Sequence, residues 1–486
     1  MKDNKGLSKR VFRSGAVLAL ANGVARALAM LCYLQLSRWL APATFGIYSL
    51  VSSLVGIGTT IGLQGLDLAY SRYIRNPRDK RYRYEEAFLL KRATKSAILS
   101  GAIFAFIWIL LTDIRGQHGD ITIEMLYIAL TITISVLATM IAARARTQQC
   151  YSKISIAMIA GAAVGALLSL SVAFAGYRGV LPLIVGGLAT WAVMLILMIP
   201  FPARALGVET ISVEPNRQNE MIRFGFSSSV VSTVYLLVSS SDRWFLAFNR
   251  NSADLGVYAV ASTVALAGLM INAAIGLTLY PEAGHFVSNQ EGDFSVGLAR
   301  LCEQLIALLL VVMLLVGSVG RPVLRILTAE SFHRGTTYIP WLACGAFFYG
   351  MANVGYLPFF LERKMDKVAI IWVIASVASL LLNVNLVAVH GGIGAAISQM
   401  LTYLIVCTIT IVEGRRVMRL PIRWFKVMVS TLIAIGGLVA LVSLDVSNSC
   451  IEIAVDLVID LAIGCIITSL LATEQYTLFN KDQFLL

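Results

Sequence analysis

The chain has 486 residues, of which 58% are hydrophobic and only 14% are charged, and its mean hydropathy is +0.79. A soluble domain carries about 25% charged residues, so this composition excludes an ordinary soluble protein and points to a lipid bilayer. The net charge of +12 would also fit a nucleic-acid-binding protein, but the placement of the basic residues argues against that class.

Apolar runs recur along the whole chain. Each has roughly 18 or more residues and can cross about 30 Å of hydrocarbon as a helix, which satisfies its own backbone groups in lipid. In chain order the fourteen runs are residues 15–37, 44–66, 96–112, 121–142, 154–175, 181–202, 224–248, 255–280, 301–319, 336–361, 368–389, 393–412, 427–444 and 453–472. The sequence therefore predicts an all-α integral membrane protein with about 14 transmembrane helices.

The basic residues fall mainly on one side of this predicted arrangement. With a cytoplasmic N-terminus, 30 of the 39 Lys and Arg residues lie on the cytoplasmic side and 7 on the other, where Arg321 and Arg325 are assigned to the loop after the ninth run. This is the positive-inside signature, so both termini are predicted to be cytoplasmic. Membrane topology therefore explains the excess of basic residues. An interaction of these residues with anionic lipid headgroups is a secondary interpretation, and no nucleic acid partner is expected. The first run lacks a cleavage site and is interpreted as a retained span.

An internal repeat relates the two halves of the chain. The segment "FGIYSLVSSLVGIGTTIGLQGLDLAY" begins at residue 45, and "LGVYAVASTVALAGLMINAAIGLTLY" begins 210 residues later. At this offset Gly46 matches Gly256 and Tyr48 matches Tyr258. We predict two parallel six-helix lobes around a central cavity, because transporters are built in this way. The predicted N-lobe is 1–202, the cytoplasmic linker 203–223, the C-lobe 224–413, and the C-terminal pair of spans with the tail 414–486.

Two segments carry a family resemblance. "LSRWLAPATFGIYSLVSSLVGIGTTIGLQGLDLAYSRYI" and "SSSDRWFLAFNRNSADLGVYAVAS" resemble matching parts of bacterial polysaccharide transporters of the O-antigen flippase type, within the multidrug/oligosaccharidyl-lipid/polysaccharide exporter superfamily. The resemblance implies a V-shaped pair of lobes in the bacterial inner membrane. It also implies a lipid-linked oligosaccharide as substrate, for lipopolysaccharide O-antigen or exopolysaccharide, and membrane lipids and a polysaccharide polymerase or other assembly proteins as partners.

The main candidates for a substrate site are three charged residues inside predicted spans, Arg26, Asp242 and Arg243. Arg26 is about eleven residues into the first span, roughly 16 Å deep, where a cation is costly unless it faces water or a partner. Asp242 and Arg243 are adjacent in the seventh span, so their side chains point about 100° apart and each should find its own partner. Arginine suits a diphosphate, and Asp242 could serve a coupling cation or pair with Arg26. The alternative for all three is a structural pair or a helix-end anchor.

Other polar residues are weaker candidates. Asp67 and Arg72 follow the second span and are either substrate ligands or ordinary loop charges. Asn383 and Asn385 either line a polar cavity or hydrogen-bond between helices, and the glycines Gly161 and Gly165 fit close helix packing. No nucleotide-binding motif, metal cluster or cofactor motif is recognisable, so no cofactor is expected and coupling to a proton or sodium gradient is predicted instead.

The sign of the intramembrane charges distinguishes between the remaining candidate functions. Two arginines against one aspartate favour an anionic headgroup, such as a polyprenyl diphosphate, over the organic cation of a multidrug antiporter. A membrane-embedded polysaccharide polymerase or ligase is the other alternative, but such enzymes usually display a large outer loop and the longest here has about 16 residues. The sequence thus predicts a flippase or exporter of a lipid-linked oligosaccharide and not an enzyme.

Overall fold

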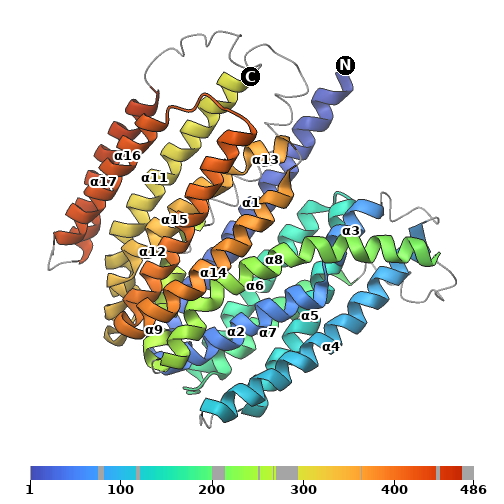
Figure 1. Cartoon of the computed structure of the whole chain (residues 1–486). Helices are drawn as coiled ribbons and strands as arrows, with labels where there is room; N and C mark the ends of the chain where they lie inside the picture. Colours follow the sequence, from blue (N-terminus) through green and yellow to red (C-terminus); the bar gives the residue numbers. More distant parts are fainter. Residues whose placement is uncertain are drawn as a thin grey trace. The chain divides into compact units, whose positions relative to one another are not determined.

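The computed structural model describes residues 2–74, 82–115, 121–199, 214–249, 252–265, 267–269, 294–362, 364–444 and 449–472. All regular structure in these residues is helical (Figure 1). The helices are α1 (Lys2–Leu36), α2 (Pro42–Leu63), α3 (Leu66–Tyr73), α4 (Arg83–Arg115), α5 (Ile121–Thr147), α6 (Tyr151–Phe174), α7 (Leu181–Met198), α8 (Pro215–Asn249), α9 (Ser252–Ala265), α11 (Phe294–Leu327), η2 (Glu330–Thr337), α12 (Ile339–Gly355), α13 (Leu357–Leu361), α14 (Met365–His390), α15 (Gly392–Val417), α16 (Trp424–Ser443) and α17 (Ser449–Ala472).

The described helices match the predicted membrane spans, and residues 266 and 270–280 of the predicted span 255–280 lie outside the described residues. Within the described residues, 11 stretches are long and apolar enough to cross a membrane, and the apolar part of α1 is a shorter one. The two further predicted spans fall on α8 and α17, which carry charged side chains inside their apolar runs. The all-α membrane fold is confirmed, and the protein is a multi-pass membrane protein.

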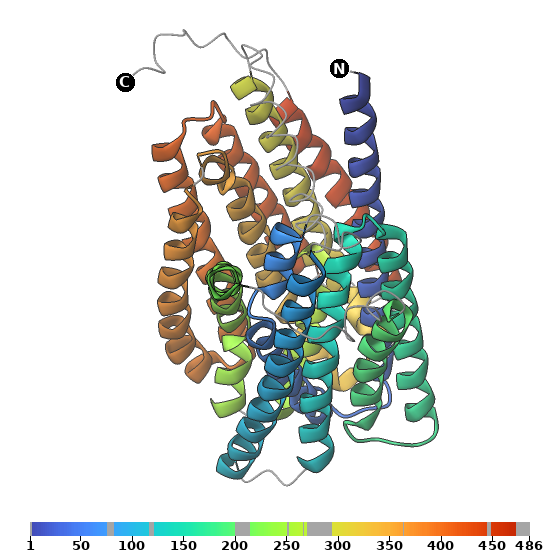
Figure 2. The ribbon, with the colours of Figure 1, turned by 90° about the vertical axis from the view of Figure 1, so that its right-hand side faces the viewer.

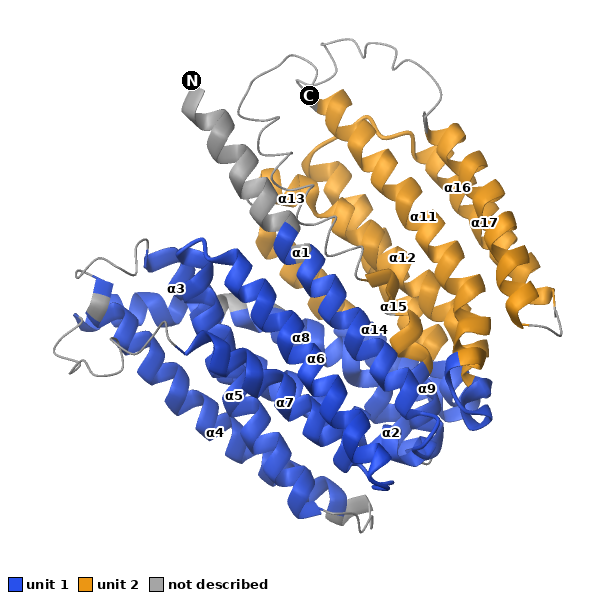
Figure 3. Ribbon diagram, turned by 180° about the vertical axis from the view of Figure 1, so that it is seen from behind, with its two compact units in different colours: residues 1–260, 327–334, 376–395 blue, residues 261–326, 335–375, 396–486 orange. Residues whose placement is uncertain are grey.

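Two compact units divide the chain (Figure 3). One contains residues 1–260, 327–334 and 376–395, and the other contains residues 261–326, 335–375 and 396–486. The first unit therefore holds α1 to α8, most of α9 and the second half of α14. Helix α8 begins at Pro215, inside the predicted linker, and the division into lobes at residues 202 and 224 stays a prediction.

A sharp break separates α2 from α3 in the first unit. Helix α2 starts with Pro42 at its first turn, where a missing N–H costs nothing, and it ends at Gln64 in the left-handed region. Gly65 follows with φ +65°, a conformation that glycine adopts without strain. A Cβ at Gly65 would also overlap the carbonyl oxygen of Gly225 on α8. Glycine is therefore required here twice, by the backbone angle and by the approach of α8.

The repeat-related glycines of the first unit contact each other. A Cβ at Gly46 would overlap the carbonyl oxygen of Ser252, and one at Gly256 would overlap the carbonyl oxygen of Pro42. Residues 42 and 252 are separated by the same 210 positions as residues 46 and 256. The contact is thus reciprocal, as a two-fold relation between two copies of a motif requires. Small residues at this crossing let the backbones of α2 and α9 approach closely.

Close packing also joins α6 to α7. A Cβ at Gly161 would lie 2.6 Å from the Thr190 carbonyl oxygen, and one at Gly165 would lie 2.6 Å from that of Gly186. The predicted small-residue packing of Gly161 and Gly165 is therefore confirmed. On the other side of the unit, α4 and α5 pack along their lengths (Figures 1 and 2).

The second unit is assembled around α11. Leu438 of α16 packs at Gly317 of α11, and Val311 of α11 packs at Gly464 of α17. Helix α11 continues to Leu327, so it includes Arg321 and Arg325, which the sequence had placed in an outer loop. Both arginines pair with Glu452 of α17, and this pairing lets the helix carry them beyond its apolar run.

Candidate functional site

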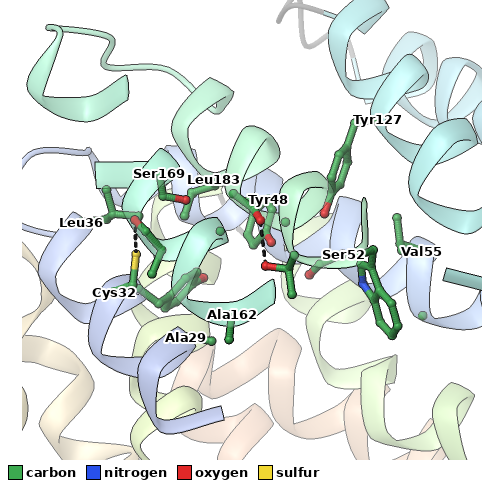
Figure 4. Close-up of a pocket in the computed structure, with 18 of the residues that line it drawn as sticks. Ala29, Cys32, Leu36, Tyr48, Ser52, Val55, Tyr127, Ala162, Ser169 and Leu183 are labelled. Atoms are coloured by element: carbon green, nitrogen blue, oxygen red, sulfur yellow. Dashed lines mark hydrogen bonds between the residues drawn. The ribbon is translucent and has the colours of Figure 1, made fainter. Parts of the chain in front are cut away.

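A pocket of about 450 Å³ opens among the N-terminal helices of the first unit (Figure 4). Its wall combines aromatic rings, hydroxyl groups and small residues from α1, α2, α5, α6 and α7. The lining includes Ala29, Cys32, Tyr33, Tyr48, Ser52, Thr59, Tyr127, Ser169, Gly187, Thr190 and Trp191. Aromatic faces beside hydroxyl groups can bind a molecule that has both apolar and hydrogen-bonding surfaces.

The tyrosines are held by aromatic packing and by a glycine. The Tyr33 ring meets Phe45 edge-on at 4.7 Å and lies 6.2 Å from Tyr48, which in turn lies 6.3 Å from Tyr127. A Cβ at Gly187 would come within 2.6 Å of the Tyr127 hydroxyl oxygen. The missing side chain at Gly187 therefore leaves room for the tyrosine hydroxyls inside the pocket, where Figure 4 shows Tyr48 and Tyr127.

The hydroxyl groups on the α6–α7 side are already donors to the backbone. Ser169 donates to the Pro182 carbonyl at 2.8 Å, and Thr190 donates to the Gly186 carbonyl at 2.9 Å. Because a hydroxyl has one hydrogen and two lone pairs, both groups keep acceptor capacity for a ligand. This wall of the pocket is thus suited to accepting hydrogen bonds from hydroxyl or amide donors.

Arg26 lies on the pocket side of α1. It precedes Ala29 by one helical turn and Tyr33 by two, and residues at this spacing share a helix face. Its side chain is exposed, and its Nε donates to the Asn22 side chain at 3.2 Å, one turn earlier on the same helix. A single amide occupies one of five guanidinium donors, so most of the donors of Arg26 can bind a ligand.

Asp242 and Arg243 differ in how fully their side chains are hydrogen-bonded. Asp242 is 4% exposed; it accepts from the Tyr258 hydroxyl and, at 2.8 Å, from the Arg243 backbone N–H. The Arg243 side chain is half-buried, and its Nε finds no hydrogen-bond partner among the described residues. The guanidinium interacts electrostatically with the Tyr33 hydroxyl at the pocket. Arg243 is therefore a cation next to the pocket with an unused donor.

A small polar cluster lies beside the Asp242–Arg243 pair. Ser241 on α8 and Ser379 on α14 lie 3.1 Å apart between their hydroxyl oxygens. Asn383 donates to Ser241 at 3.0 Å, which agrees with the second of the two alternatives for this asparagine, hydrogen bonding between helices. Asn385 instead bonds the Leu381 carbonyl of its own helix at 2.7 Å.

Asp67 and Arg72 have structural neighbours away from the pocket. Asp67 forms an ion pair with Arg146 of α5 at 3.7 Å. The Arg72 guanidinium lies 4.4 Å from the centre of the Phe224 ring on α8, a cation–π distance. None of the five predicted substrate ligands lines the pocket. Arg26 lies on the α1 face that carries Ala29 and Tyr33, and Arg243 acts electrostatically on Tyr33.

Sequence reasoning missed the tyrosines of the pocket and the acidic face of α17. Tyr33, Tyr48 and Tyr127 lie in three different predicted spans, and only the repeat match of Tyr48 with Tyr258 singled one of them out. The carboxylates at residues 452, 456 and 460 recur every four positions, a signal that the sequence did display. These carboxylates also correct the predicted count of intramembrane charges. The count of two arginines against one aspartate describes the surroundings of the pocket, whereas α17 carries additional acidic residues.

The fold is similar to that of several solved transporters. A structure titled lipid II flippase MurJ, inward closed conformation, matches with a TM-score of 0.68 and 11% identity, covering 93% of this chain and 98% of that one. An inward-facing multidrug resistance MATE family transporter matches with a TM-score of 0.63 and 14% identity over 84% and 98%. A MOP superfamily transporter from Pyrococcus furiosus, described as having a binding pocket of reverse polarity, matches with a TM-score of 0.57 and 13% identity over 84% and 96%.

The family follows from the sequence itself. The model of the polysaccharide biosynthesis protein family matches residues 35–336, more than half of the chain, and the protein belongs to this family. The match spans both segments on which the resemblance was drawn, so the predicted relationship is confirmed. No curated protein matches the chain.

Proposed function

We propose that this protein is a secondary transporter that moves a polyprenyl-diphosphate-linked oligosaccharide across the bacterial inner membrane for cell-surface polysaccharide biosynthesis. The observation that carries the proposal is the pocket of the first unit, whose Tyr33 interacts electrostatically with Arg243 and lies on the same face of α1 as Arg26. Membership of the polysaccharide biosynthesis family and a fold shared with a lipid II flippase support the same conclusion.

The two ends of such a substrate need different chemistry. The diphosphate is an anion with several acceptor oxygens, which two guanidinium groups bind through charge-assisted hydrogen bonds. The sugars combine apolar ring faces with hydroxyl groups, and the tyrosines and hydroxyls of the pocket offer both kinds of contact. The polyprenyl chain stays in the hydrocarbon, and movement of one half of the chain against the other exposes the sugar on the periplasmic side.

The multidrug antiporter is the competing function, since transporters of that kind share the fold. An organic cation would be attracted to carboxylates at the pocket, whereas the charged neighbours of this pocket are arginines, and Asp242 is engaged by Tyr258 and the backbone. The balance of charge therefore favours an anionic substrate.

Asp242 is the residue we propose for coupling to a proton or a sodium ion. It is a buried carboxylate beside the cluster of Ser241, Ser379 and Asn383, and the Asn383 side-chain oxygen has no hydrogen-bond partner among the residues described. Neutral oxygen donors next to a carboxylate are suitable ligands for a small cation. In this proposal the gradient supplies the energy for transport, with both termini in the cytoplasm.

A deletion strain tests the proposal. Loss of the protein is expected to cause lipid-linked sugar units to accumulate in the cytoplasmic leaflet, where an added impermeant glycosidase cannot reach them in intact spheroplasts. Complementation with the wild type should restore access, and Arg26→Ala/Arg243→Ala should not, at equal expression. Unchanged distribution of the lipid-linked sugar in the deletion strain would contradict the proposal, and restored drug resistance as the only effect of complementation would favour the antiporter.

A further inference from the structure

Helix α17 presents one polar stripe to its neighbours and an apolar surface elsewhere. The stripe consists of Glu452, Asp456 and Asp460, which recur every fourth residue and are 1%, 3% and 1% exposed. Large apolar side chains on other faces of the helix are exposed, including Val458 at 68% and Leu461 at 63%. In a membrane those side chains face lipid, so the carboxylates must find their partners on the helices that pack against α17.

The first of the three carboxylates is neutralised by arginine. Glu452 lies 3.0 Å from Arg325 and 3.9 Å from Arg321, both on α11. Asp456, one turn further along α17, interacts electrostatically with Arg321 and with Glu452. Two arginines therefore face the first two carboxylates, and the charges of this part of the stripe balance.

Asp460, the third carboxylate of the stripe, is not neutralised by these two arginines. Its charged neighbour is Asp456, a like charge one helical turn away, and it sits near the middle of α17. Helix α16, which also packs on α17, buries Ser430, Ala434 and Leu438 and places no charged residue among its buried side chains. An ionised Asp460 would thus be a third negative charge, deep in the membrane, without a countercharge among the described residues.

The hydrogen bonds of Ser318 explain how Asp460 is accommodated without a countercharge. The Ser318 hydroxyl oxygen lies 2.6 Å from an Asp460 carboxyl oxygen and 2.8 Å from the Leu314 carbonyl oxygen, and Ser318 is fully buried. A hydroxyl has a single hydrogen, so it cannot donate fully to two acceptors at once. Both contacts are satisfied when Ser318 donates to Leu314 and Asp460 donates a proton of its own to Ser318.

The surroundings contain a surplus of acceptors. The other oxygen of Asp460 is buried and has no hydrogen-bond partner among the described residues. A proton on the carboxyl group supplies the donor for the contact between Asp460 and the Ser318 hydroxyl, and it also removes the uncompensated charge.

We infer that Asp460 and Ser318 form a proton-binding site within the second unit, in which the protonated carboxyl group of Asp460 holds α17 against α11. The site is independent of the proposed transport function. Because the folded state holds this proton while an ordinary exposed carboxylate is ionised above about pH 5, the docking of α17 should weaken as the pH rises.

Infrared difference spectroscopy of the purified full-length protein tests the assignment. The wild type should show the carbonyl stretch of a protonated carboxylic acid at neutral pH, and Asp460→Asn should lose it while the control Asp456→Asn retains it. Ser318→Ala should shift the band to higher frequency, because the carboxyl group loses its hydrogen-bond acceptor. A band that survives in Asp460→Asn, or no band in the wild type, would overturn the inference.

Thermal unfolding of the same proteins gives a second, independent readout. Asn is a neutral mimic of the protonated side chain, so Asp460→Asn should unfold close to the wild type at about pH 6 and should not lose stability as the pH rises to about 8, where the wild type does. A strong fall in the unfolding temperature of Asp460→Asn at the lower pH would show that the charge is needed. Stabilisation of the wild type, but not of Asp460→Asn, by sodium in place of choline would assign a bound cation and contradict the proton.

Discussion

Two groups of intramembrane charges differ in how completely they are paired. On α17 of the second unit, Glu452 receives two arginines from α11, and the stripe runs along the helix contact. Beside the pocket of the first unit, Arg243 keeps a donor without a partner among the described residues, and Arg26 has only an amide from its own helix. The difference indicates that the α17 charges hold helices together, whereas the arginines near the pocket are available to a ligand.

The largest effect is expected from breaking the paired group. Glu452→Ala leaves Arg321 and Arg325 facing each other without their carboxylate, and the loss of one partner of a buried pair costs about 3–5 kcal/mol. The unfolding temperature measured in detergent should fall sharply. Glu413→Ala is the matched control, because its partners Lys367 and Arg416 are exposed and such pairs contribute about 0–1 kcal/mol. Equal stability of the two variants would contradict the structural role.

At the pocket we expect a loss of substrate binding without a loss of stability. Arg243→Ala should leave the unfolding temperature unchanged but weaken binding of undecaprenyl diphosphate by about 10- to 100-fold, the value of hydrogen bonds to a charged group. Arg243→Lys keeps the positive charge but loses the forked geometry of the guanidinium donors. Its affinity for undecaprenyl diphosphate should therefore lie between those of the wild type and Arg243→Ala. Arg178→Ala, an exposed arginine that contacts the Trp39 carbonyl, is the control. Weakened binding in the control alone would place the anion site elsewhere.

A smaller effect should follow from cutting the contact between α8 and α14. Asn383→Ala removes its two hydrogen bonds to Ser241 and Ser379, and hydrogen bonds between membrane helices contribute about 0.6 kcal/mol on average. Asn385→Ala is the matched control, since that side chain bonds its own helix and is exposed. If Asp242 serves ion coupling, Asn383→Ala should also change the sodium or pH dependence of transport, and Asn385→Ala should not.

The smallest effects are expected at the two remaining candidates. Asp67→Asn and Arg72→Ala should each change stability by less than about 1 kcal/mol, because an exposed ion pair and a surface cation–π contact contribute little. Both variants should bind undecaprenyl diphosphate like the wild type. A loss of binding as large as that of Arg243→Ala would move the site from the pocket to the end of α3.

The repeated features of the chain could be predicted from sequence. Apolar runs located the spans because every membrane helix must cover its backbone with apolar side chains. The offset of 210 residues matched Gly46 with Gly256, and the structure shows that these two glycines pack against each other. The spacing of Gly161 and Gly165 likewise predicted a close helix contact that is present.

Features that depend on a partner helix could not be predicted in this way. The tyrosines at positions 33, 48 and 127 come from three helices, and no spacing along one helix brings them together. Arg321 was assigned to a loop because a charge normally ends an apolar run, and its place inside α11 depends on Glu452, far along the chain. Asp242 and Arg243 are adjacent in sequence and were each expected to find a partner; only the structure identifies Tyr258 as a partner of Asp242, and the Arg243 Nε has none among the described residues.

The central claim is that the arginines of the first unit serve an anionic lipid-linked substrate, and reconstituted transport tests it most directly. Proteoliposomes loaded with an undecaprenyl-diphosphate-linked oligosaccharide should move its headgroup across the bilayer with the wild type. Arg26→Ala/Arg243→Ala should abolish this movement while remaining folded. Full transport by the double variant, or transport of ethidium in place of the oligosaccharide by the wild type, would contradict the account.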